Sequence, residues 1–414
     1  MKIRYIYSAC IVIETGDLRI CCDPWFTQGI YDGSWYQYPA VSDPIKTIGP
    51  VNFIYVSHIH PDHYDPPYLK ALLEANEGCK LLIGDKNQSF LRAKMIRDGF
   101  RPLTVDYLKV GTTELAIFPS TSYTEQNIDS ALVVRGDGQV VVNMNDCPFD
   151  DRQTGEILAF SGQVPDMACL PYAGAGPTPQ RYRFSTPELQ REAAAKKREQ
   201  FLLQFQKYFD QLAPRWAMPF AGLYYLGGKL RNLNSVRGIP DAIEVKQRFG
   251  ERVVVLKEGG GSIDLSTNEI CDERTEPYST ADRDAALSQF DSSPMPYEDD
   301  VAPSEAELVS LLKTAHNNAM TRVNDRPDRK ILIKCPDTRF MCLDNDTPGA
   351  VEVLEKPDRT LAREEIFLDS RLLHGLLTRK FHWNNAEIGS HFEIYRWPEV
   401  YDRRVYHLLT FLHN

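Results

Sequence analysis

The chain has 414 residues, of which 43% are hydrophobic and 11% aromatic, a composition typical of a folded protein with a large core. Its 57 acidic residues outnumber its 47 Lys and Arg residues, which gives a net charge of −10. This balance argues against a protein that binds nucleic acid through phosphate contacts.

The nine cysteines are odd in number, scattered, and include no C-x-x-C pair. This pattern indicates neither a disulfide framework nor a zinc knuckle, and it favours reduced thiols. The chain opens on alternating strand residues rather than on a leader, and it contains no apolar run of the roughly 18 residues that a membrane span needs. We therefore expect a cytoplasmic protein without a transmembrane segment.

The first predicted elements are two strands of a hairpin, at residues 3–13 and 18–22. Residues 26–50 are rich in Gly, Tyr and Pro and show no period, which predicts a loop. Aromatic side chains in such a loop either stack on a substrate or pack the loop against the protein, and the sequence leaves both open.

A metal-site pattern follows the predicted buried strand at residues 51–56. His58 and His60 are two positions apart, so they point to the same side if the strand geometry continues, and both can bind one ion. Asp62 and His63 lie on the next turn, where they can face a second ion or a metal-bound water. A single histidine is more often an ordinary core or surface residue, but this cluster predicts a metal site.

Helices and strands alternate from residue 66 to residue 118, and a hairpin is predicted over residues 130–147. A Pro-containing start and an apolar stripe predict a helix from residue 185 to about residue 212. Strands at 215–221 and at 263–265 complete this part of the chain.

The sequence changes character after Cys271. Residues 271–304 are polar and acidic, which predicts a linker or a surface excursion. Residues 305–414 contain a predicted helix followed by strands and a helical end, without a recognisable site of their own. We expect an accessory domain there that covers the pocket or offers a surface to a partner.

The H-x-H-x-D-H pattern at the end of a strand resembles the signature of the metallo-β-lactamase superfamily. A longer series of segments, in the same order, looks most similar to the metallo-β-lactamase-type domain of CMP-N-acetylneuraminate hydroxylase. These segments are Asp23-Pro24-Trp25, residues 57–63, Asn145-Asp146-Cys147, and residues 173–177, 219–222 and 260–265. The resemblance implies an α/β protein with an αββα sandwich over residues 1–270 and a smaller C-terminal α+β domain.

The resemblance also implies roles for individual residues. Asp146 stands where the superfamily carries a metal-bridging aspartate, with a turn-capping residue as the alternative. Asp23 stands beneath the site and either orients a metal ligand or only caps a turn. Trp25 and Tyr224 are the other residues expected near the ligands or the substrate. The expected metal ligands are His58, His60, Asp62, His63, Asp146 and Glu125.

Glu125 enters this set because two expected histidines are absent. No histidine occurs between His63 and His316, so Glu125 is the expected substitute for the first missing ligand, with Asn127 and Asp129 beside it. Oxygen ligands shift preference from zinc toward iron or manganese. We therefore expect one or two divalent ions, which are zinc, iron or manganese, in a site closed by oxygen ligands or by a histidine from the C-terminal unit.

Three functions follow from these patterns. The first is a hydrolase for a small anionic substrate, such as a sugar nucleotide or a phosphorylated compound, in which the metal lowers the pKa of a water and Asp62 takes its proton. The second is an iron oxygenase with a separate electron donor, because the hydroxylases also carry a Rieske domain and this sequence has no C-x-H…C-x-x-H pair. The third is a ligand-binding relative with a degraded site.

Overall fold

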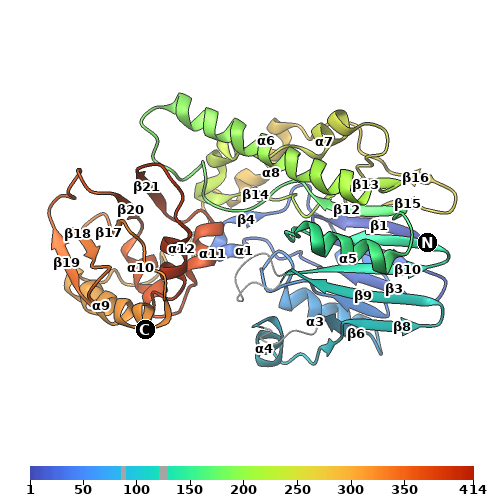
Figure 1. Cartoon of the computed structure of the whole chain (residues 1–414), viewed down its shortest axis with the longest axis horizontal. Helices are drawn as coiled ribbons and strands as arrows, with labels where there is room; N and C mark the ends of the chain where they lie inside the picture. The colour runs from blue at the N-terminus through green and yellow to red at the C-terminus, as the bar shows by residue number, and fades with distance from the viewer. Residues whose placement is uncertain (85–89, 121–128) are drawn as a thin grey trace.

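The computed structural model describes residues 1–84, 90–120 and 129–414 (Figure 1). Two mixed sheets face each other with helices on their outer sides, and a third large sheet lies at the other end of the molecule. This is the predicted αββα sandwich with a smaller C-terminal α+β region. No helix of the described residues is both long and apolar enough to cross a membrane.

The first sheet has eight strands in the order β16-β15-β1-β2-β3-β5-β6-β7. Its first five strands in this order are antiparallel, and β3, β5, β6 and β7 run parallel. The bounds are β1 (Lys2–Tyr7), β2 (Cys10–Glu14), β3 (Arg19–Cys22), β5 (Phe53–Tyr55), β6 (Lys80–Ile83), β7 (Leu103–Thr104), β15 (Gly261–Asp264) and β16 (Glu269–Cys271).

The second sheet has six strands in the order β13-β12-β11-β10-β9-β8. Alternate residues of both sheets, such as Ile11 and Leu132, are fully buried in the layer between them, which is the core of the sandwich. The bounds are β8 (Tyr107–Val110), β9 (Thr113–Pro119), β10 (Ser130–Gly136), β11 (Gln139–Asn143), β12 (Met167–Pro171) and β13 (Trp216–Phe220).

Helices cover the outer face of each sheet because each helix has an apolar side to bury. The first sheet packs against α2 (Pro44–Ile48), α3 (Pro66–Ala75) and α4 (Phe90–Arg97). The second packs against α5 (Asp151–Ser161), α6 (Pro187–Leu212) and α7 (Ala242–Phe249). The long helix α6 starts where predicted, since the Thr186 side chain accepts a hydrogen bond from the Leu189 backbone and Pro187 occupies the first turn.

The predicted loop at residues 26–50 contains short elements that no period could reveal. They are α1 (Ile30–Gly33), whose interior has left-handed backbone angles, and β4 (Trp35–Tyr36), followed by α2. β4 pairs with β14 (Tyr225–Leu226), which leads into the 3₁₀ helix η1 (Gly228–Val236). A pair of two-residue strands is too short to give a sequence signal.

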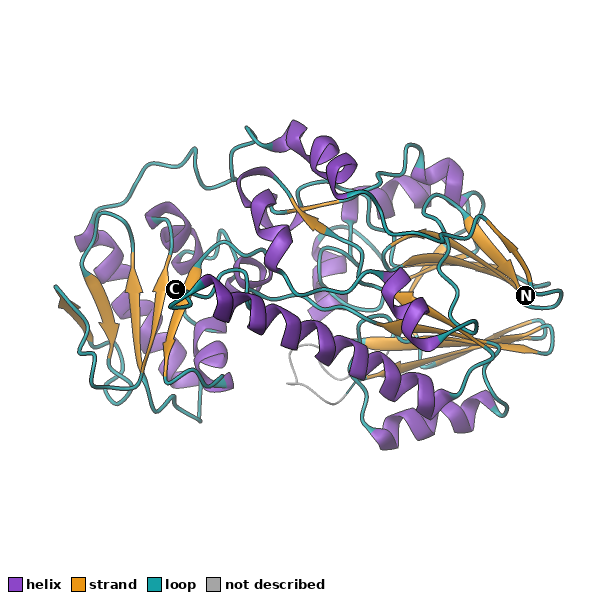
Figure 2. Cartoon of the chain, turned by 90° about the horizontal axis from the view of Figure 1, so that it is seen from above, coloured by secondary structure: helices purple, strands orange, loops and turns teal. Residues whose placement is uncertain are grey.

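The C-terminal sheet has the order β19-β18-β17-β20-β21 and helices on its sides (Figure 2). Residues 181–183 of the first half pair with its edge strand β21, through hydrogen bonds between Arg183 N and Ile394 O (2.8 Å) and between Ile394 N and Arg181 O (2.9 Å). The bounds are α9 (Glu305–Arg322), β17 (Lys330–Lys334), β18 (Phe340–Leu343), β19 (Val351–Leu354), β20 (Arg363–Phe367), α10 (Ser370–Leu377), α11 (Trp383–Ile388), β21 (Glu393–Trp397) and α12 (Arg403–Thr410).

Residues 271–304 carry α8 (Thr280–Leu287) and η2 (Ser288–Phe290). Met295 and Tyr297 in this segment are buried, and the salt bridge between Arg231 and Asp291 (2.6 Å) attaches it to η1. The division of the chain at residues 270 and 304 remains a prediction.

Candidate metal centre

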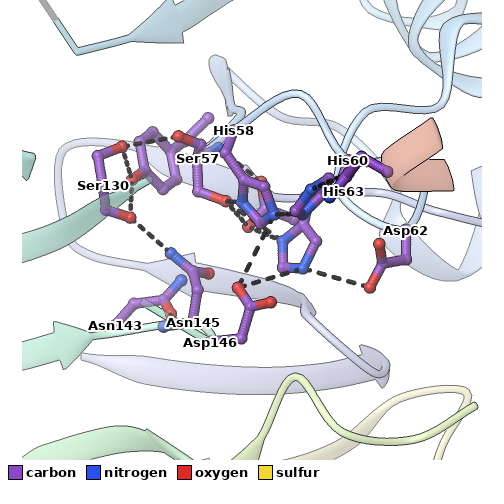
Figure 3. Close-up of polar contacts among 12 residues, drawn as sticks. Ser57, His58, His60, Asp62, His63, Ser130, Asn143, Asn145 and Asp146 are labelled. Carbon is purple, nitrogen blue, oxygen red and sulfur yellow. Dashed lines mark hydrogen bonds and ion pairs between the residues drawn. The ribbon is translucent and has the colours of Figure 1, made fainter. Parts of the chain in front are cut away.

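The loop after β5 and the loop after β11 bring three histidines and two aspartates together (Figure 3). His58 Nε2 lies 2.9 Å from His60 Nδ1 and 3.9 Å from Asp146 Oδ1. His63 Nε2 lies 3.5 Å from the same Asp146 oxygen and 3.5 Å from Asp62 Oδ2. The side chains of the predicted pattern therefore point toward one another, with Asp146 reached from two sides.

These separations suit atoms that share an ion. Two donors at about 2.0–2.2 Å from one metal lie about 2.8–3.6 Å apart for the usual bond angles. The donors of His58, His63 and Asp146 all lie within 4.8 Å of one another. His63 Nε2 and Asp146 Oδ1 are buried without a hydrogen-bond partner, which is rare in proteins unless something else satisfies such atoms. The residues therefore fit a divalent cation.

Asp129 belongs to the same group of carboxylates. Burial, followed by the charge of Asp146, raises its pKa well above the ordinary value. Its Oδ1 atom is also buried without a partner. Glu125, the predicted substitute ligand, lies outside the described residues. Asp129 is thus the carboxylate that the structure places near Asp146 in this stretch of the chain.

Asp23 holds His63 from the side opposite the metal cluster. This carboxylate is fully buried and accepts hydrogen bonds from Ser57 N (2.8 Å) and Ser57 Oγ (2.8 Å). Its Oδ2 lies 3.0 Å from His63 Nδ1. A carboxylate on Nδ1 keeps the proton there and leaves Nε2 free to bind a metal, which is the orienting role expected of a residue beneath the site.

His60 is held by the C-terminal region. Its Nε2 lies 3.2 Å from Asn384 Oδ1 on α11, and the Asn384 amide donates to the Tyr406 hydroxyl on α12 (2.5 Å). This contact leaves His60 Nδ1 turned toward His58. His382 accepts a hydrogen bond from the Asn384 backbone, and His391 lies 2.7 Å from the Tyr31 carbonyl. An asparagine, rather than either histidine, therefore reaches the cluster from this side.

Tyr31 was missing from the sequence prediction. Its buried hydroxyl donates to Asp62 Oδ1 at 2.6 Å, and its ring lies 6.4 Å from that of His60. Tyr31 follows the left-handed Gly29 in an aperiodic loop, so the only available signal was its place in an aromatic-rich segment.

Trp25 and Tyr224 are both buried near the site without facing the metal cluster. The Trp25 ring packs against Tyr7 and its Nε1 donates to Thr27 O (2.7 Å). Tyr224 stacks on Trp35 with ring centroids 3.3 Å apart. Neither contact shows a substrate role for these two residues.

The charges of the cluster shift its pKa values in opposite directions. Burial disfavours charged His63, but Asp146, Asp62 and Asp23 outweigh it and raise the His63 pKa well above the ordinary value. Burial acts to raise the Asp62 pKa, but His63, His60 and the Tyr31 hydrogen bond lower it. Burial lowers the pKa of both His58 and His60. Without a metal, the cluster thus combines the neutral imidazoles of His58 and His60 with a charged His63 beside the carboxylates of Asp62 and Asp146.

Comparison with known proteins agrees with this geometry. The family model of the beta-lactamase superfamily domain matches residues 2–176. The chain has the metallo-β-lactamase fold. This match confirms the resemblance found in the sequence.

Two curated relatives match more than half of the chain. A protein from Mycolicibacterium smegmatis, whose name describes it as a Rieske 2Fe-2S iron-sulfur protein, is 30% identical over 270 residues, which are 62% of this chain and 50% of that protein. The cytidine monophosphate-N-acetylneuraminic acid hydroxylase of Asterias rubens is 26% identical over 238 residues, 54% of this chain and 35% of the hydroxylase. The chain thus spans half or less of the length of these relatives.

Among solved structures, the metallo hydrolase Igni18 of Ignicoccus hospitalis matches with a TM-score of 0.41 and 15% identity, over 64% of this chain and 98% of that one. This likeness is too low to support further conclusions.

Proposed function

We propose that this chain is a metal-dependent oxygenase that hydroxylates a small anionic substrate with electrons from a separate donor protein. The observation that carries the proposal is the donor set, in which the carboxylates of Asp62 and Asp146 lie among the imidazoles of His58, His60 and His63. Such oxygen-rich sets favour iron or manganese over zinc. Similarity to a sugar-nucleotide hydroxylase supports the same chemistry and suggests a sugar nucleotide as the substrate.

We assign His58, His60 and Asp146 to one ion, a combination of two imidazoles and one carboxylate that is typical of non-haem iron(II) oxygenases. Asp62 and His63, which lie 3.5 Å apart, would then be available to hold a second ion. Bound iron would supply the activation of dioxygen, while the protein holds the ligands in place through Asp23, Asn384 and Tyr31.

A hydrolase is the second candidate, and one observation favours it. His63 and the Tyr31 hydrogen bond lower the pKa of Asp62 against the effect of burial, so that this carboxylate is ionised and able to accept a proton. A bound divalent ion would supply a water of lowered pKa for the attack on a small anionic substrate.

Mass spectrometry separates the two candidates. The full chain is loaded with iron(II) and incubated with CMP-N-acetylneuraminate, oxygen and a chemical reductant. An oxygenase inserts one oxygen atom into a C–H bond, with the second atom leaving as water at the expense of two electrons and two protons. We expect a product one oxygen heavier that Asp146→Asn protein does not form. If the substrate is instead cleaved by water, and is cleaved equally when dioxygen is excluded, the second candidate is established.

A further inference from the structure

A second pocket, of about 450 Å³, lies between α6, the end of η1 and the start of α8. This volume is in the range of small-molecule sites. In Figure 1 these elements lie together on one side of the sandwich. The charged residues of its lining are Arg191, Arg198, Arg237, Arg283 and Asp241. Four guanidinium groups around one carboxylate are unusual in a chain with a net charge of −10.

Arg237 differs from the other arginines of this pocket. Only 5% of the residue is exposed, and its guanidinium carbon lies 3.8 Å from the centre of the Tyr224 ring. Its Nη1 donates to Tyr224 O (2.8 Å) and to Asn234 Oδ1 (3.0 Å). Its Nε and Nη2 atoms are buried without a hydrogen-bond acceptor in the described part of the chain. Unsatisfied buried donors on a cation are costly, so they indicate a missing partner.

The remaining charges of the lining are already compensated. Each has a partner of opposite sign within 3.2 Å: Arg191 with Glu188, Arg198 with Glu244, Arg283 with Asp284, and Asp241 with Arg274. No carboxylate of the described residues forms an ion pair with Arg237. The uncompensated charge of the pocket is therefore the guanidinium of Arg237.

The backbone holds Arg237 in place. The next residue, Gly238, has a φ of 67°, and a Cβ atom there would lie 2.5 Å from the Ala194 carbonyl of α6. Only glycine fits this close approach. The positive charge is also felt by Lys197 on α6, since burial and then Arg237 lower the Lys197 pKa to about 7.

We propose that this pocket binds the oxyanion of a small molecule, a carboxylate or a phosphate, at Arg237, whose buried Nε and Nη2 atoms have no acceptor in the described part of the chain. The Nε and Nη2 edge of a guanidinium presents two parallel donors that match the two oxygens of such an anion. Tyr224 offers no stacking face, because Trp35 covers one side of its ring and Arg237 lies over the ring as well. The pocket goes beyond the proposed function and does not depend on it, since none of the assigned metal ligands lines it.

Isothermal titration of the full chain with inorganic phosphate, and separately with acetate, tests the proposal. We expect saturable binding of at least one of these anions to the wild-type protein and binding about ten- to hundredfold weaker in Arg237→Gln, the range for lost charge-assisted hydrogen bonds. Arg152→Gln, on the exposed side of α5, removes the same charge elsewhere and should bind like the wild type. Phosphate alone would point to phosphate esters, and acetate alone to carboxylates.

Asp146→Asn separates this pocket from the metal centre. We expect anion binding to survive in Asp146→Asn protein, whatever happens to its metal or activity. The proposal is overturned if neither anion binds the wild type, if Arg237→Gln binds as tightly, or if Asp146→Asn abolishes binding. Should Arg237→Gln fail to fold, Arg237→Lys keeps the charge but not the paired donors, and unchanged binding in that variant would also overturn the proposal.

Discussion

Two buried charged regions lie near the same group of aromatic rings, and their charges are opposite. Around the metal cluster, Asp146 and Asp129 have buried oxygen atoms without partners, whereas in the second pocket Arg237 has buried nitrogen atoms without partners. The rings of Tyr31, Trp35 and Tyr224 lie between them, with centroids 4.5 Å and 3.3 Å apart in that order. One region therefore suits a cation and the other suits an anion.

Buried charges elsewhere in the fold show what a satisfied arrangement looks like. In the C-terminal sheet, Arg396 Nε lies 2.8 Å from Glu364, and Arg363 Nε lies 2.6 Å from Glu365. Both pairs belong to the structure and need no ligand. The contrast supports the two proposed binding sites, because buried polar atoms without hydrogen-bond partners destabilise the fold unless something satisfies them.

The largest expected effect is that of Asp146→Asn on metal binding. We expect metal affinity to fall by more than about a hundredfold, because altering partners of ligands alone costs 10–100-fold. Elemental analysis of protein purified without added metal provides the measurement, with Asp337→Asn in an exposed C-terminal turn as the control. Equal metal content in both variants would mean that Asp146 is not a metal ligand. The metal cluster would then not be the cation-binding counterpart of the Arg237 pocket.

Asp23 and Asp65 form a matched pair that separates stability from metal binding. Both are buried carboxylates that accept backbone and hydroxyl hydrogen bonds, Asp23 from Ser57 and Asp65 from Phe26 and Thr27. We expect each change to alanine to lower the free energy of unfolding by about 2–4 kcal/mol, as orphaned buried donors do. Urea unfolding gives this quantity.

Metal content then distinguishes the two variants. Only Asp23→Ala should weaken metal binding, by about tenfold or more, because only Asp23 holds His63. If Asp65→Ala weakens metal binding as much as Asp23→Ala does, metal binding follows overall stability instead.

Asn384→Ala tests the contribution of the C-terminal region. Without its Oδ1 atom, His60 is free to rotate, and we expect metal affinity to fall by about tenfold. Competition with a chromophoric chelator measures the loss, and Asn385→Ala on the same helix is the control. Unchanged metal affinity in Asn384→Ala would show that the C-terminal region does not contribute to metal binding.

The smallest effect concerns pH. His63 has a raised pKa in the folded protein, so the stability that it contributes without metal is present below the ordinary pKa of about 6.5 and is lost as pH rises through the raised value.

A metal ion needs neutral His63, so the affinity of the protein for the metal should increase with pH by about tenfold per unit below that raised pKa. Calorimetry in two buffers should show at least one proton released per ion at pH 7, and no proton release would contradict protonated His63.

The sequence alone predicted the sandwich and the convergence of the histidine pattern, because a strand followed by closely spaced ligands is a local signal. The partners of those ligands were harder to find. Asn384 meets His60 only through packing of the C-terminal helices, 324 positions along the chain. Tyr31 sits in an aperiodic loop with left-handed backbone angles.

The roles of the aromatic residues stay predictions. Trp25 and Tyr224 were expected near ligands or substrate, and the structure buries their rings against Tyr7 and Trp35. Composition marks a residue as aromatic but cannot tell a ring that faces a ligand from one that packs a loop. In the same way, Arg237 looked like any other arginine until its buried and unpaired donors were seen.

Anomalous scattering from crystals of the protein as purified, recorded at the iron and zinc absorption edges, tests the metal centre most directly. We predict a peak among His58, His60 and Asp146, at about 2.0–2.2 Å from His58 Nε2, that is strong above the iron edge. A peak that appears only above the zinc edge would contradict the iron assignment, and a cluster without any peak would contradict the metal centre itself.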